Sequence, residues 1–370
     1  MEFFKPGVRF NFLKIAKPLL MMSAILVFAS WTLVATKGLN FGIDFAGGTE
    51  ALLSFKKPVD IQALREEISK TGLEMPEVVT YGHTDQGKYF VRSRSQSLLS
   101  EAEKAKLKAA IIEKVGKPVV YNDGDESGEE VRVKFGSKPK KGLLKEALTA
   151  AGFPTATVGT HADASNPTYR LTLPGIRDRL EAAMTAYKGQ NFTGADKFES
   201  VGSAVGTQMR NQGILSVIYA LLGILLYVSF RFDLRYSPGA VLALVHDVSI
   251  TIGVFSLFGL EFNLPIIAAL LAIVGYSLND TIVVYDRIRE SLKLGLGDNL
   301  VESINISVSD CLSRTVLTSV TTFLAVLSIY VFGGGIIQNF ALAMLIGVVI
   351  GTYSSIYVAS PAVVRMDSYL

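Results

Sequence analysis

The sequence predicts an α-helical membrane protein with six transmembrane helices and an α+β domain outside the membrane. Two observations lead to this fold class. Hydrophobic residues make up 49% of the 370 residues, which is high for a soluble chain of this length. The apolar residues also gather in six runs, each long enough to cross a hydrocarbon core of about 30 Å.

We place the six spans at residues 15–36, 211–230, 238–259, 264–286, 313–333 and 338–361. The short termini are then residues 1–14 and 362–370. The first span continues into WTLVATKG without a small-residue cleavage signature, so we interpret it as a retained helix rather than a removed signal peptide.

The placement of basic residues predicts the orientation. Lysines and arginines flank alternate ends of the spans, at Lys5, Arg9, Lys14, Lys17, Arg231, Arg235, Arg287, Arg289, Lys293 and Arg365. The short loops at 260–263 and 334–338 carry neither residue type. The positive-inside rule therefore predicts that both termini are cytoplasmic and that residues 37–210 lie outside, in a periplasm-like compartment.

Residues 37–210 read as alternating strands and helices in the order β-α-β-β-α-β, which then recurs. The two halves also share text, since KPVDIQALREEISKTG resembles KPKKGLLKEALTAAG. We predict two tandem ferredoxin-like modules, at 37–122 and 123–210. The alternative is one larger α+β domain with a coincidental repeat.

The chain offers no pattern typical of an enzyme. It lacks the phosphate-binding motif GxxxxGK[ST], and it shows no interpretable Ser/His/Asp or Cys/His constellation. No cluster of residues has metal-ligand spacing. We therefore predict no catalytic residues, no metal, no cofactor and no nucleic-acid partner, with membrane lipid as the surroundings of the spans.

Two aspartates lie inside apolar spans, where a charge costs about 2.5–3.5 kcal/mol on insertion scales. Asp247 lies near the middle of the third span, and Asp280 lies about 9 Å from the cytoplasmic end of the fourth. Arg314 begins the fifth span at the same end, so Asp280 and Arg314 could pair. The alternatives are hydrogen bonding between helices for the acids and snorkelling to water for Arg314.

The surroundings of Asp280 favour a packed interior. Ser277, Asn279 and Thr281 add polarity, and Gly275 permits close helix approach. His246 is adjacent to Asp247 but points about 100° away from it around the helix. A carboxylate in such a place suits a proton pathway driven by the membrane potential.

Several long motifs resemble the SecD/SecF family, and they occur in the family's order. FGIDFAGGTE at 41–50 resembles its signature after the first span, and it contains Gly42, Asp44, Gly47 and Gly48. The stretches at 199–209, 244–264, 275–290, 313–334 and 341–361 resemble successive membrane motifs. HDV in the third span and GYSLNDT in the fourth favour the SecF side of the family.

The resemblance implies a half bundle of the RND superfamily that uses the proton-motive force in protein export across the bacterial inner membrane. It implies SecD, the SecYEG channel and unfolded preproteins as partners, with YajC as a further candidate. By motif position, Asp280 and Arg314 match the family's proton-coupling acid and arginine, and Asp247 matches the acid of the third span.

The external segment departs from the family, whose usual domain there is a single small module. An alternative function is an RND-type exporter subunit for lipids or small molecules, although six spans are half of the usual set. A scaffold that does not use protons is a third hypothesis, against which Asp247 and Asp280 argue.

Overall fold

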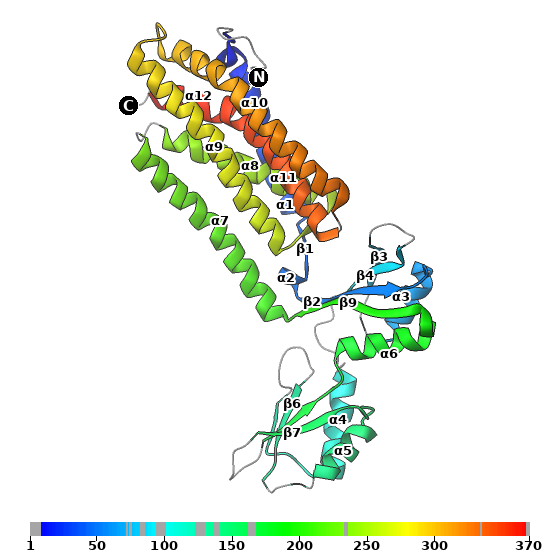
Figure 1. Cartoon of the computed structure of the whole chain (residues 1–370). Coiled ribbons are helices and arrows are strands. Elements are labelled where there is room, and N and C mark those ends of the chain that lie inside the picture. The colour runs from blue at the N-terminus through cyan, green and yellow to red at the C-terminus, as the bar shows by residue number, and fades with distance from the viewer. Residues whose placement is uncertain are drawn as a thin grey trace. The chain divides into compact units, whose positions relative to one another are not determined.

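The computed structural model describes residues 9–367 except 72, 74–75, 82–85, 94–100, 123–129, 137–138, 140, 162–167, 233–235 and 334. The chain divides into two compact units (Figure 1). One comprises residues 1–42 and 210–370, and the other comprises residues 43–209.

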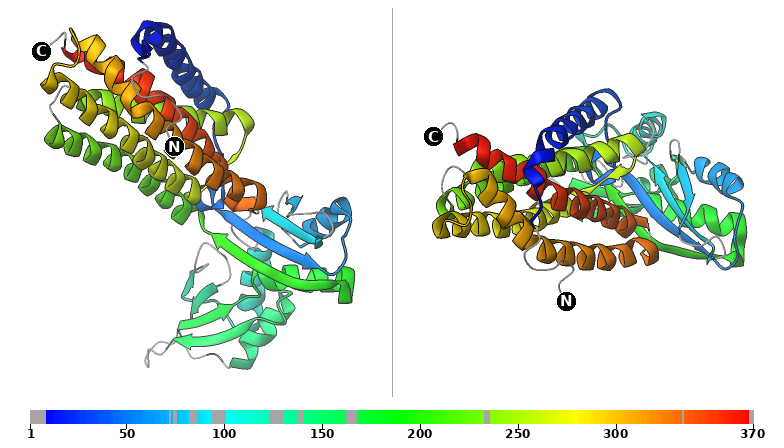
Figure 2. Two further views of the ribbon diagram at one scale, coloured as in Figure 1. Left: turned by 45° about the horizontal axis from the view of Figure 1, so that its top comes forward. Right: turned by 90° about the horizontal axis from the view of Figure 1, so that it is seen from above.

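The described residues form six apolar helices long enough to span a membrane, which confirms the predicted fold class. In chain order the helices are η1 (Phe12–Ile15) with α1 (Ala16–Thr36), α7 (Ser203–Arg231), α8 (Ser237–Phe258), α9 (Leu264–Leu294), α10 (Leu300–Phe332), and α11 (Gly335–Ser354) with η4 (Ser355–Ala359) and α12 (Ser360–Asp367). They lie side by side as one bundle (Figures 1 and 2). The third, fourth and sixth spans are mostly buried within it, whereas the first two are mostly exposed.

A short parallel ladder closes one end of the bundle. β1 (Asn40–Phe41) follows α1 and pairs with β10 (Glu261–Phe262), which lies in the short connection between α8 and α9. The amide of Gly42 extends this ladder by donating to the carbonyl of Phe262 at 3.0 Å.

The described part of the other unit forms two four-stranded antiparallel sheets. The first has the order β3-β4-β2-β9, formed by β2 (Gly48–Phe55), β3 (Glu77–Thr80), β4 (Lys88–Ser93) and β9 (Phe192–Val201). Helix α3 (Ile61–Ser69) joins β2 to β3, two strands that flank β4, which is a split βαβ arrangement. Helix α6 (Ile176–Lys188) comes from the second sheet and leads into β9, which lies beside β2.

The second sheet has the order β5-β6-β8-β7 and is formed by the middle of the segment. Its strands are β5 (Val120–Asn122), β6 (Glu130–Lys134), β7 (Thr157–His161) and β8 (Thr168–Thr172), with helices α4 (Glu101–Lys114) and α5 (Lys141–Ala150).

The predicted boundaries of the tandem modules, 37–122 and 123–210, are therefore wrong. β9 pairs with β2 along eight residues rather than with its neighbours in sequence, and β5 pairs with β6 across the expected boundary. The two halves have exchanged their last helix and strand, so that the second module, residues 101–172, is inserted into the first.

Side-chain packing explains the exchange. The apolar face of α6, at Ile176, Leu180 and Met184, is buried in one core with Leu64 and Ile68 of α3. The spacing of four residues places these three side chains on one face of α6.

The corresponding face of α4 is buried in a separate core, which belongs to the inserted module. Leu107 and Ile111 of α4 pack there with Val131 of β6 and Leu144 of α5. Each sheet thus takes the helix that completes its own core.

Candidate functional site

Asp247 is completely buried in α8, and several hydrogen bonds hold its carboxylate. Ser277 of α9 donates to Oδ2 at 2.6 Å, and Ser354 at the end of α11 donates to the same oxygen at 2.8 Å. The other oxygen, Oδ1, lies 2.9 Å from Nδ1 of His246. Three helices therefore meet at this single carboxylate.

The predicted separation of His246 from Asp247 is wrong. The two side chains start in directions about 100° apart on the helix, but the imidazole folds back to the neighbouring carboxylate. The ring of His246 also stacks on Tyr353, with centroids 6.0 Å apart. Its Nε2 is buried and has no hydrogen-bond partner among the described residues.

Asp280 lies one turn after Ser277 on the same buried face of α9 and is 4% exposed. Its Oδ2 has no hydrogen-bond partner within the described part of the chain. Ser319 of α10 interacts with the carboxylate through a side-chain hydrogen bond, and the hydroxyl of Ser319 also pairs with that of Thr352 at 2.7 Å. Asp280 is thus enclosed by protein without being held as Asp247 is.

Arg314 lies on α10 with an exposed side chain. Its charge acts on the Asp280 carboxylate, but no close ion pair joins the two residues in the described structure. Asp280 and Arg314 thus lie on the neighbouring helices α9 and α10. Their direct pairing, which the sequence suggested, stays a prediction.

Glycines of α11 bring the polar residues together. A Cβ on Gly351 would lie 3.0 Å from the Cβ of Ser277, and a Cβ on Gly347 would lie 2.3 Å from Ile273. Small residues four apart allow two membrane helices to approach closely. Gly275, which the sequence favoured for this role, is exposed and faces open space.

The end of α11 contributes residues that the sequence did not single out. Ser354 bonds to Asp247, and Ser355 shares a hydrogen bond of 3.0 Å with Thr281. The helix is locally π-helical from Ser355 to Ala359, a distortion often found at functional sites. Two adjacent serines in an apolar span were the sequence signal that could have identified Ser354 and Ser355, although serine in such a span also allows simple close packing of helices.

The glycines of the signature have conformational roles. Gly47 and Gly48 have φ angles of 75° and 134°, which suit glycine, and they connect the short helix α2 (Ile43–Ala46) to β2. A Cβ on Gly42 would lie 2.4 Å from Oε1 of Glu261 and 3.0 Å from the Cβ of Asn263, so a larger residue there would displace the Glu261 side chain. Asp44 lies in the first turn of α2.

The described residues contain no group of three or more His, Cys, Asp and Glu side chains placed to hold a metal ion. The arrangement of Asp247, Asp280 and their hydroxyl neighbours is chemically suited to bind and release protons.

Comparison with known families agrees with the motifs. The family described as "Protein export membrane protein SecD/SecF, C-terminal" matches residues 181–368, and "SecD/SecF GG Motif" matches residues 32–59. The second match contains Gly42, Asp44, Gly47 and Gly48.

Relatives are similar along almost the whole chain. Protein translocase subunit SecF of Calditerrivibrio nitroreducens is 34% identical over all of this chain and 97% of its own length. The Magnetococcus marinus protein of the same name is 38% identical over 99% and 95%. SecF of Escherichia coli O157:H7 is 32% identical over 93% and 84%.

The fold also resembles a solved structure. The crystal structure of SecDF from Thermus thermophilus, a translocon-associated membrane protein, matches 98% of this chain with a TM-score of 0.64 and 31% identity. This chain spans 39% of the length of that SecDF chain. The extent of these matches shows that the chain belongs to the SecF side of the SecD/SecF family of protein-export membrane proteins.

Proposed function

We propose that the chain is an accessory subunit of the Sec protein translocase and that it couples the proton gradient to a late stage of preprotein export. The observation that carries the coupling is the contrast inside the bundle. Asp280 is buried with an unpartnered oxygen, while Asp247 nearby is fully bonded.

An ionised carboxylate with a buried oxygen that accepts no hydrogen bond is costly in a medium with little water. Two events relieve this cost at Asp280: it binds a proton, or the exposed guanidinium of Arg314 moves closer. A cycle that alternates between these two states links proton entry to a movement of α10 against α9. The membrane potential supplies about 2.3 kcal/mol for each charge per 100 mV.

Asp247 and Ser277 provide the neighbouring part of the path. Ser277 donates to Asp247 and precedes Asp280 by three residues on one face of α9. A proton released by Asp247 therefore needs to pass only one hydroxyl to reach the turn that holds Asp280.

The partners follow from the relatives. SecD and SecF are a single chain in SecDF of Thermus thermophilus, which supports SecD as the partner here. We extend this proposal to the SecYEG channel, to unfolded preproteins and to YajC. The chain is a multi-pass membrane protein, and we assign it to the inner membrane with both termini cytoplasmic.

Export of lipids or small molecules is not favoured, because the relatives named above are translocase subunits. The function also requires no catalysis by this chain, since proton movement supplies the energy.

The test replaces Asp280 by Asn in the complete chain, together with its SecD, in inverted membrane vesicles. Late-stage release of a preprotein is measured with and without a proton gradient. We expect the variant to lose the stimulation by the gradient and to keep the release that occurs without it, because asparagine cannot exchange a proton.

Asp286→Asn is the matched control, because Asp286 lies on the same helix with a side chain that is 46% exposed. It should keep the stimulation. Full stimulation in Asp280→Asn would show that this carboxylate does not couple protons to release.

A further inference from the structure

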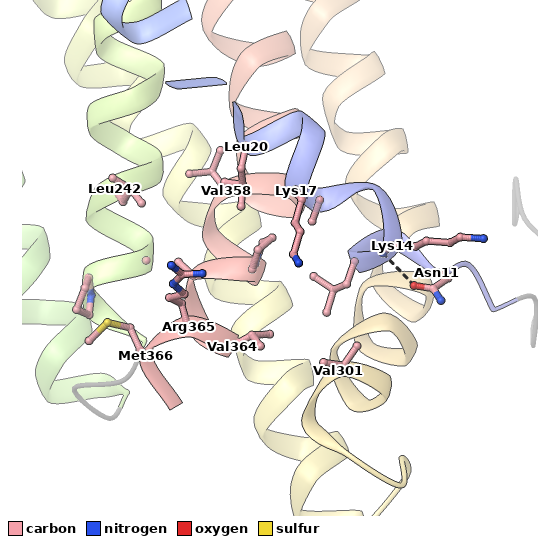
Figure 3. Close-up of a pocket in the computed structure, with 16 residues that line it drawn as sticks. Asn11, Lys14, Lys17, Leu20, Leu242, Val301, Val358, Val364, Arg365 and Met366 are labelled. Atoms are coloured by element: carbon pink, nitrogen blue, oxygen red, sulfur yellow. Dashed lines mark hydrogen bonds between the residues drawn. The ribbon is translucent and has the colours of Figure 1, made fainter. Parts of the chain in front are cut away.

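A cavity of about 790 Å³ lies within the helical bundle near the beginning of α1 (Figure 3). It is lined by η1 and α1, by the first turns of α8 and α10, and by η4 and α12. This volume is within the range of ligand sites, roughly 300–1,000 Å³.

Most of the wall is apolar. Leu20, Leu242, Val301 and Val358 contribute side chains to it. Leu242 and Val301 are 53% and 41% exposed, so the cavity opens on the surface of the bundle. Leu242 lies in a predicted span, so on its side the opening faces lipid chains rather than water.

Three basic residues line the cavity. Lys17, the second residue of α1, points into the cavity, and Arg365 lies on the wall that α12 forms (Figure 3). Lys14 lies at the rim. None of the described residues that line the cavity is an aspartate or a glutamate, so the described lining bears only positive charge.

We propose that this cavity binds one anionic phospholipid. Its phosphate lies between Lys17 and Arg365, and an acyl chain lies against Leu20 and Leu242. The combination of basic residues at the ends of spans with an apolar recess fits the two parts of such a lipid, whereas a soluble phosphate would leave the apolar wall unused. A zwitterionic lipid gains less from the two cations.

The experiment uses the full chain, purified in detergent and titrated with phosphatidylglycerol or phosphatidylcholine. Bound lipids are counted by native mass spectrometry. We expect one phosphatidylglycerol to bind more tightly than any phosphatidylcholine. Lys17→Gln and Arg365→Gln should each weaken this binding about fivefold, because a basic side chain near a membrane contributes about 1 kcal/mol, and Lys17→Arg should retain it.

Two matched controls separate the cavity from the general lipid shell. Lys293→Gln removes an exposed lysine of α9 that does not line the cavity, and it should not weaken binding. Leu242→Trp should fill the opening and weaken binding. Leu257→Trp, on the same helix with 48% exposure, should not.

Equal effects of Lys17→Gln and Lys293→Gln would overturn the proposal, as would equal affinity for the two lipids. Displacement of the lipid by inorganic phosphate would reduce the site to an anion site and overturn it too. A dimer that Leu242→Trp abolishes would instead assign the cavity to a second copy of the chain.

Discussion

Asp247 and Asp280 are both aspartates buried in the helical bundle, but they differ in what surrounds them. Asp247 accepts from Ser277 and Ser354 and contacts His246, whereas Asp280 keeps an oxygen without a hydrogen-bond partner in the described structure. A bonded carboxylate stabilises the bundle. An enclosed carboxylate with an unpartnered oxygen is instead able to respond to a proton or a cation.

Substitution of Asp247 should give the largest effect in a test of this difference between the two carboxylates. Replacing it by Ala leaves the donors of Ser277 and Ser354 without their acceptor, and we expect the free energy of unfolding to fall by about 3 kcal/mol. Asp280→Ala should lower it much less or raise it, because a poorly solvated charge is removed. Thermal unfolding of the purified chain in detergent, followed by circular dichroism, measures both. Equal losses would mean that the two carboxylates do not differ as described.

Gly351 tests what holds the Asp247 site together. Gly351→Val places atoms against Ser277 and separates α9 from α11, so we expect a loss of about 2 kcal/mol in the same unfolding assay. Gly275→Val is the control, since a side chain there meets open space. If Gly275→Val is the more destabilising substitution, the close approach of these helices is not made through Gly351.

A third carboxylate, Asp196 of β9, extends the comparison to an exposed site. A hydrogen bond from Ser54, and next the ammonium of Lys88, lower the pKa of Asp196. A lowered folded-state pKa means that Asp196 stabilises the fold above its ordinary pKa of about 4 and loses this effect as the pH falls through the folded value.

Asp196→Asn should therefore lower the free energy of unfolding more at pH 7 than at pH 3. The difference should be less than about 1 kcal/mol, because the ion pair with Lys88 is largely exposed. Unfolding of the full chain and the variant at both pH values measures it. The same difference at both values would contradict the role of ionisation.

The sequence predicted the six spans well, because an uninterrupted apolar run has few interpretations. It also identified Asp247 and Asp280, since a charge in such a run is conspicuous. It did not reveal Ser354 or the contact of His246, because hydroxyls suit many environments and helix geometry alone does not determine where a side chain ends.

The local sequence pattern could not predict which helix and strand complete which sheet. Both α4 and α6 have a suitable apolar face and are followed by a strand, so either could complete either sheet. Only the packing of Leu107 with Leu144 and of Leu180 with Leu64 decides between them. Pairing between distant segments is set by tertiary contacts, and the hydrophobic periodicity of a single segment does not report on these.

The pairing of β9 with β2 also bears on the order in which the unit of residues 43–209 folds during synthesis. Phe55 of β2 pairs with Phe192 of β9, so the edge of β2 stays open until almost the whole unit has been made. Residues 101–172 contain every strand of their own sheet and can fold earlier. We therefore expect the inserted module, residues 101–172, to fold during synthesis before the sheet that contains β2 is complete. The long-range pairing of β9 with β2 should then be the slow last step.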